Sequence, residues 1–281
     1  MVEMNGYSNK QLLRMLGEHS LWGKYACQEA LRRKEDFVPF LLEAIDYAIT
    51  NPKELADETY ELYVPAAFLL AHQREKQAYT RLLELFKMED VYSDTDGGAS
   101  IVTFIKILLR DTFNGDTSLL PQIAEDPSNA LWVRIKALDT HALLYVDGYV
   151  SRKELTEYLR YLFNEVFAGP PENNDMLRLV TMIAGVVQDH HLLELNPEVK
   201  NLYDHKWIER EAFGDYDAWL AVASSSGQLI REGHINDAIH DLAECGWFTE
   251  ESDAKNFEDN YFDSTLDHRK AVILPFRIKN D

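Results

Sequence analysis

The amino-acid sequence predicts an all-α fold in which antiparallel helical hairpins stack into a solenoid. Apolar residues recur at helical spacing along nearly the whole chain, which is typical of amphipathic helices. Only 13 glycines and 9 prolines occur among 281 residues, fewer than a sheet protein with many tight turns would need. The predicted helix pairs also recur at an interval of roughly 40 residues, so one structural unit is repeated.

The beginning of the chain predicts a helical cap for the repeats. Three stretches have an apolar face at helical spacing: 9–16, 24–34 and 38–49. Asn51 and Pro52 follow the third stretch, and proline interrupts a helix because it lacks a backbone N–H. We therefore expect residues 1–52 to form an N-terminal helical cap.

The clearest hairpin lies in residues 63–86. Two helices with apolar faces are predicted there, and the polar break between them is so short that the second must fold back on the first. Asn114 and Gly115 mark a similar turn between two further predicted helices, because both residue types tolerate positive φ. Ser151 and Glu154 have the spacing of a capping box, which predicts the start of another helix.

The first helices of successive hairpins are predicted to begin near residues 59, 98, 129, 174 and 215. Their mean separation of roughly 40 residues is typical of HEAT or armadillo repeats, whose helix pairs bury their apolar faces by stacking into an α-α superhelix. We expect this array to cover residues 53–247. Residues 248–281 are acidic and end in AVILPFRI, which predicts a non-repeating tail whose final strand or extended segment docks on the array.

The formal charge of −20 bears on the choice of partner. An acidic surface repels nucleic-acid phosphates and anionic lipid headgroups, so we expect neither nucleic acid nor membrane as a partner. A protein or peptide with a basic segment is favoured instead. The alternative is that the surplus carboxylates simply keep the protein soluble.

Cysteine content and apolar patterning bear on location and cofactors. The two cysteines, Cys27 and Cys245, are too far apart in the sequence to predict a metal cluster or a disulfide framework. The chain does not begin with a basic and then apolar leader, and no apolar run approaches the ~20 residues of a membrane helix. We therefore expect a cytoplasmic protein without a cofactor.

Few residues are arranged for chemistry, and none forms a nucleophile elbow, a P-loop or a zinc-protease motif. Residues 94–98 resemble the start of a calcium loop, but position 12 would be Thr103 instead of a bidentate acid, so a turn is the better interpretation. His234, Asp237 and Asp241 would share one face of a predicted helix and could ligate a metal. The same spacing suits a solvated helix face, so we predict no catalytic or metal-binding residue.

One set of residues fits partner binding. On the predicted helix 151–167, four side chains lie beside the apolar stripe without being needed for it: Glu154, Tyr158, Tyr161 and Glu165. The second helices of stacked hairpins line the concave groove of a solenoid, and tyrosine is enriched in interfaces. We expect these four residues to contact a partner, the alternative being that both tyrosines are core-edge residues. Trp132 and Trp219 are predicted to be buried in the core.

Four stretches together resemble the bacterial DUF1186 family: YVPAAFLLAHQREKQAYTRLLELF (63–86), FNGDTSLLPQIAEDPSNALWVRIKALDTHALL (113–144), VSRKELTEYLRYLF (150–163) and HINDAIHDLAECGWF (234–248). The resemblance covers about residues 55–250. It implies an α-α superhelix without an established reaction, so there are no catalytic residues to transfer. Some members continue into a cysteine-rich zinc-binding tail, but this sequence has no cysteine after Cys245.

Two functions follow from these observations. The first is a non-enzymatic scaffold that binds a protein or peptide along a concave helical groove, because the repeats come without a catalytic constellation. The alternative is an enzyme, such as a metal-dependent hydrolase, with its site in the same groove and ligands from the His/Asp set at 234–241.

Overall fold

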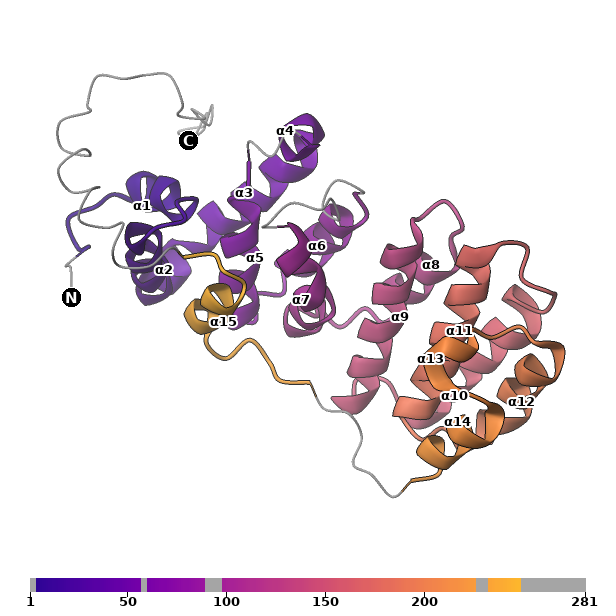
Figure 1. The fold of residues 1–281 in the computed structure, drawn as a ribbon. Helices are drawn as coiled ribbons and strands as arrows, with labels where there is room; N and C mark the ends of the chain where they lie inside the picture. Colours follow the sequence, from indigo (N-terminus) through magenta and orange to yellow (C-terminus); the bar gives the residue numbers. More distant parts are fainter. Residues whose placement is uncertain (1–3, 57–59, 89–97, 226–231, 249–281) are drawn as a thin grey trace. The chain divides into compact units, whose positions relative to one another are not determined.

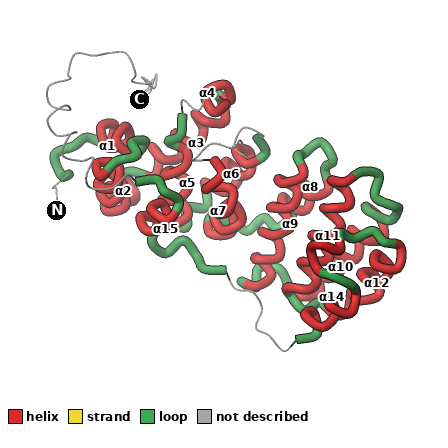
Figure 2. The backbone as a smooth tube through the Cα atoms, in the orientation of Figure 1, coloured by secondary structure: helices red, strands yellow, loops and turns green. Residues whose placement is uncertain are grey.

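A computed structural model describes residues 4–56, 60–88, 98–225 and 232–248, and the regular structure in these ranges is entirely helical (Figure 2). The predicted all-α class is therefore confirmed. The turn predicted over residues 94–98 and the tail predicted over 248–281 lie outside the described ranges, except for Gly98, which begins a helix, and Phe248. Within those ranges, no helix is both long and apolar enough to cross a membrane.

The chain divides into two compact units, and each is described by itself. Unit 1 comprises Met1–Thr103 and Ile235–Asp281, and unit 2 comprises Phe104–His234. The helices predicted before residue 87 are all found, with bounds that differ by a few residues at most. The helices that lie in unit 1 or begin there are α1 (Asn9–Leu16), α2 (Leu21–Arg33), α3 (Val38–Thr50), α4 (Pro52–Ala56), α5 (Tyr63–His72), α6 (Ala78–Phe86), α7 (Gly98–Asp111) and α15 (Ala238–Glu244) (Figure 1).

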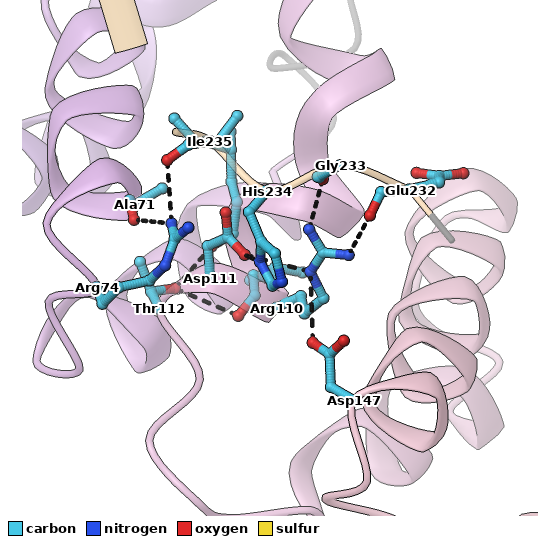
Figure 3. Close-up of polar contacts among 12 residues, drawn as sticks. Ala71, Arg74, Arg110, Asp111, Thr112, Asp147, Glu232, Gly233, His234 and Ile235 are labelled. Carbon is cyan, nitrogen blue, oxygen red and sulfur yellow. Dashed lines mark hydrogen bonds and ion pairs between the residues drawn. The ribbon is translucent and has the colours of Figure 1, made fainter. Parts of the chain in front are cut away.

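Helix α5 is the centre of unit 1. Every residue from Tyr63 to Ala71 is buried, because α3, α6 and α15 pack around this helix. A helix that is apolar on all sides is stable only when its neighbours cover all of them. The segment leading into α15 is held by Arg74, whose guanidinium donates to the backbone oxygens of Ala71 (2.6 Å) and Ile235 (3.2 Å) (Figure 3).

Unit 2 contains the remaining helices. Helix α9 packs against α8, α10 and α11, and α11 also packs against α14, so the apolar faces of these helices form one core. The predicted helices are found here too, and the one predicted to begin near residue 215 ends at Ala223. The elements are α8 (Leu119–Glu125), α9 (Leu131–Val146), α10 (Arg152–Tyr161), a π-helical turn (Leu162–Val166), α11 (Asn174–Asp189), a 3-10 turn (Leu193–Leu195), α12 (Asn196–His205), α13 (Arg210–Phe213) and α14 (Tyr216–Ala223).

Helix α10 has a distinct structure at each end. At its start, the Ser151 hydroxyl accepts from Glu154 N–H and the Glu154 carboxylate accepts from Ser151 N–H (2.8 Å), so the predicted capping box is confirmed. After its last residue the helix widens into the π turn, where Phe167 N–H donates to the Leu162 oxygen five residues earlier (2.8 Å). Single π turns of this kind occur often at functional sites.

The two tryptophans predicted to be buried lie in different environments. Trp219 on α14 is fully buried, and its indole N–H donates to the Ala184 oxygen at 3.1 Å, so this prediction is confirmed. The prediction for Trp132 is wrong, because its side chain is 49% exposed. Helix α9 buries Val133, Ile135 and Leu138 instead, which leaves Trp132 in the first turn on the outer face.

Candidate functional site

Unit 2 contains a cluster of charged residues around the C-terminal half of α7 (Figure 3). Arg110 and Asp111 are both buried, and charged side chains are almost never fully buried unless they are paired. They contact the segment that leaves unit 2 and one residue at the end of α9. We name this cluster the α7 polar site, which comprises Lys106, Arg110, Asp111, Asp147, Glu232, Gly233 and His234.

Arg110 fixes the backbone of the segment 232–234. Its guanidinium donates to the oxygens of Glu232 (3.0 Å) and Gly233 (2.5 Å). Its Nε lies 3.2 Å from Asp111 Oδ1 and 3.7 Å from Asp147 Oδ2, so two carboxylates balance the buried positive charge. The rigid fork of an arginine suits this role, because it can donate to several acceptors at once.

Asp111 orients the ring of His234. Asp111 Oδ1 lies 2.5 Å from His234 Nδ1, and the Asp111 side chain is inaccessible to solvent. The His234 side chain, in contrast, is 44% exposed. Because a carboxylate can only accept a hydrogen bond, the neutral ring carries its proton on Nδ1 and presents Nε2 as an acceptor. A buried acid that orients an accessible imidazole is the arrangement of a general base.

Ionisable residues beside the α7 polar site have shifted pKa values. Lys106 forms an ion pair with Glu232, and Lys136 Nζ lies 3.9 Å from Asp139 Oδ2. Burial raises the pKa of Asp139 and lowers the pKa of Lys136. The pKa of Asp189 is raised by burial and then by the negative charge of Asp139. Shifts of this kind are concentrated at functional sites, although structural ion pairs produce them as well.

The expected face of His234, Asp237 and Asp241 is not formed. Helix α15 begins only at Ala238, because the Asp237 carboxylate caps it by accepting from the N–H groups of Ile239 (3.1 Å) and His240 (3.0 Å). His234 therefore lies before the helix, on Asp111. Across the described ranges, no group of three His, Cys, Asp or Glu side chains is arranged to hold a metal ion.

The four residues predicted to bind a partner differ in their exposure to solvent. Glu154, Tyr161 and Glu165 are exposed, and Tyr161 is 45% exposed. The Ser151 hydroxyl and N–H bind the Glu154 carboxylate and lower its pKa, so this residue also caps its helix. Tyr158 is half-buried with its ring 5.3 Å from that of His141, and burial followed by the charge of Glu125 raises its pKa. Their role in binding stays a prediction.

Trp132, which was predicted to be buried in the core, is instead a candidate for partner binding. It lies in the first turn of α9, two residues before Arg134. Arg134 Nε donates to the Ala124 oxygen (2.9 Å), and its guanidinium lies 5.7 Å from the centre of the Phe167 ring. The start of α9 therefore meets the end of α8 and the residue that follows the π turn. We use the name aromatic end for three exposed side chains that these elements carry, which are Trp132 on α9, Tyr161 at the last residue of α10 and Glu165 in the π turn.

A shallow groove of about 420 Å³ follows a different side of α10. Arg152 and Glu194 form two parallel hydrogen bonds of 2.8 Å across it, and the Thr156 hydroxyl donates to the same carboxylate at 3.2 Å. Because Glu194 already binds Arg152, we assign these contacts to holding α10 against the following segment. The groove is lined by Arg152, Lys153, Thr156, Glu157, Arg160 and Glu194.

Comparisons with known proteins place the chain among uncharacterised relatives. An uncharacterized protein of Chlamydia trachomatis serovar D is 24% identical over 140 residues, which cover 50% of this chain and 55% of that protein. An uncharacterized protein of Chlamydia muridarum is also 24% identical over 140 residues, which cover 50% of this chain and 56% of that protein. The chain thus spans about half the length of each relative. No solved structure matches it.

The family comparison covers most of the sequence. Residues 11–244 match the model of a family described as "Protein of unknown function (DUF1186)". This match begins earlier in the chain than the resemblance over residues 55–250 and ends close to it. The chain therefore belongs to the DUF1186 family, as the four stretches of sequence predicted.

Proposed function

We propose that this protein is a scaffold that binds a basic segment of another protein at the aromatic end of unit 2. The observation that carries the proposal is that Trp132 and Tyr161 are 49% and 45% exposed there. Tryptophan and tyrosine are the residues that most often dominate the energy of protein interfaces, because they bury a large area at a small cost in side-chain entropy.

The charge of the surface favours a basic partner. Glu165 is exposed four residues after Tyr161, and the whole chain has a formal charge of −20. Lysine and arginine side chains would meet complementary charge at the rim, and their cations could also lie over the faces of the two aromatic rings. The contacts of Arg134 with Ala124 and Phe167 would hold the aromatic end in place before the partner arrives.

The experiment is a selection of binders from a random peptide library, followed by affinity measurements on variants. We expect the selected peptides to be rich in lysine and arginine, and their binding to weaken at high salt. Trp132→Ala and Tyr161→Ala should each weaken binding about tenfold or more. Tyr149→Ala is the matched control, because Tyr149 is 60% exposed but lies in the turn between α9 and α10. Equal losses in all three variants would contradict the proposed surface.

We also infer that the hairpins stack into a HEAT-like α-α superhelix. The support is that helices close together in the sequence pack on one another in each unit, as in α1 with α2, α3 with α5 and α8 with α9. Small-angle X-ray scattering tests this architecture. A compact chain of 281 residues has a radius of gyration of about 19 Å, and a superhelix should exceed this value clearly. A value near that of the compact chain would rule out an extended solenoid.

A further inference from the structure

His234 is partly exposed, and among the described residues Asp111 is the one whose side chain binds its ring. Its Nδ1 is bound by Asp111, and within the described residues its ring makes no other hydrogen bond or ion pair. The two residues are 123 positions apart in the sequence, so tertiary structure alone brings them together.

Attachment of the segment does not depend on this ring. Arg110 already binds the backbone oxygens of Glu232 and Gly233, and Lys106 forms an ion pair with the Glu232 side chain. These contacts fix the backbone that carries His234. The contact with Asp111 then sets the orientation and the tautomer of the ring, and it is not needed to attach the segment.

The tautomer that Asp111 selects also leaves Nε2 of the ring as the proton acceptor. A neutral imidazole that donates from Nδ1 holds its lone pair on Nε2, and this atom can accept a proton from a water molecule. Nδ1–H of the ring stays bound to the buried Asp111 carboxylate, so the pair keeps its orientation when Nε2 takes the proton. Serine hydrolases use an Asp–His pair for the same purpose.

We propose that Asp111 and His234 form a general-base pair that hydrolyses carboxylic esters. Nε2 of His234 takes a proton from water while the water oxygen bonds to the acyl carbon, and the carbonyl π electrons move to the carbonyl oxygen. The tetrahedral intermediate then expels the alcohol oxygen, which receives the proton from the imidazolium. One ester and one water become one acid and one alcohol, and the neutral histidine is restored.

The charges of the α7 polar site select among esters. Three carboxylates, of Asp111, Asp147 and Glu232, outnumber the two cations of Lys106 and Arg110. This excess repels phosphate and other anionic esters, as does the formal charge of −20 on the chain. The substrate class is therefore a carboxylic ester that is neutral or positively charged near the acyl group.

The test is hydrolysis of p-nitrophenyl acetate by the full-length protein, with p-nitrophenyl phosphate as the anionic comparison. The variants are His234→Gln and Asp111→Asn. The matched control is His240→Gln, because His240 is also exposed and, within the described residues, its ring makes no hydrogen bond or ion pair. Circular dichroism and thermal unfolding of each variant separate a loss of chemistry from a loss of fold.

We expect the wild type to hydrolyse the acetate ester with a normal solvent deuterium isotope effect and to leave the phosphate ester intact. His234→Gln should lower turnover about 100-fold or more, Asp111→Asn should lower it as well, and His240→Gln should not. If Asp111→Asn fails to fold, the comparison of turnover in His234→Gln and His240→Gln still tests the proposal. Turnover no faster than with the same concentration of free imidazole would overturn the proposal. So would equal rates in the wild type and His234→Gln, or an acetyl group that accumulates on His234. This activity is independent of the binding function, which the Trp132 and Tyr161 variants test.

Discussion

The backbone oxygen of Glu18 occupies the space that a β-carbon on Gly23 would need. The Met15 oxygen would lie only 3.1 Å from the same β-carbon, so the first turn of α2 meets the end of α1 with no room for a side chain. Both obstacles are backbone atoms, which cannot rotate away as the tip of a side chain can. The connection between the first two helices therefore requires glycine at this position.

Gly23→Ala should lower the free energy of unfolding by about 2 kcal/mol. A clash with two backbone atoms should cost the upper end of the usual ~1–3 kcal/mol for overpacking, and the roughly 1 kcal/mol that alanine gains over glycine in a helix is subtracted from it. Gly185→Ala is the matched control, because its β-carbon would meet the movable tip of the Phe213 ring, 2.8 Å from Cζ. That variant should stay within about 1 kcal/mol of the wild type. Urea denaturation measures both values, and equal losses would contradict the argument.

Removal of Arg110 should destabilise unit 2 strongly. Arg110→Ala removes the cation beside the buried Asp111 carboxylate and the donor to two backbone oxygens, which we expect to cost about 3–5 kcal/mol. Arg152→Ala removes an arginine that also binds a carboxylate through two hydrogen bonds, but in a partly exposed position. It should cost less than about 1 kcal/mol. Chemical denaturation would contradict this prediction if the two variants lost similar stability.

Stability should fall as the pH is lowered from about 6.5 to 4. Burial lowers the pKa of His141 to about 4, and burial also lowers the pKa of His190 to about 4. Between pH 4 and the ordinary value of 6.5, the unfolded chain binds more protons at these residues than the folded chain does. Their contribution is complete above pH 6.5 and is lost toward pH 4, at about 3 kcal/mol per histidine.

His141→Leu isolates one part of this effect. The variant should show a shallower decrease of unfolding free energy between pH 6.5 and 4, measured by urea denaturation at several pH values. Asp139 and Asp189 act in the opposite direction, because carboxyl groups with raised pKa values favour the folded state at low pH. Since those groups remain in the variant, the difference between the two curves reports His141 alone. Parallel curves would show that His141 is not responsible.

Substitution of the tryptophan on α14 should lower stability much more than substitution of the tryptophan on α9. Trp219→Phe removes the hydrogen bond to the Ala184 oxygen and leaves a cavity in the core, so we expect a loss of about 2–3 kcal/mol. Trp132→Phe changes an exposed side chain and should alter stability by less than about 0.5 kcal/mol. Thermal unfolding of both proteins measures the contrast. A large loss for Trp132→Phe would indicate that this residue supports the core after all.

Local signals in the sequence predict most helices of this fold correctly. The capping box of Ser151 and Glu154 fixes the start of α10, because both partners lie within one turn. The start of α15 is less predictable, since the apolar pattern allows a helix from residue 234 while the Asp237 side chain delays it to Ala238. Trp132 is misplaced for a related reason, because helical periodicity shows that a helix has an apolar face but leaves its edges ambiguous.

The α7 polar site could not be predicted, because its parts come from distant segments. Asp111 and His234 are brought together by tertiary packing, and no fixed spacing in the sequence predicts such a pair. The available signal is that Arg110 and Asp111 end an otherwise apolar helix, where buried charges require partners from elsewhere. That signal identifies Arg110 and Asp111 as part of a site but does not identify the segment 232–234 that they bind.

The π turn after Tyr161 is equivalent to a single-residue insertion in a regular helix. Deleting Asn164 should restore ordinary α-helical winding, and the residues after it would rotate by about 100° around the helix axis. Phe167 would then leave Arg134 while every aromatic and acidic side chain of the surface remained present. The deletion therefore changes the direction in which these side chains point around the helix axis without changing which residues are present. Relatives with the same residues but one position fewer in this turn would present them in a different direction.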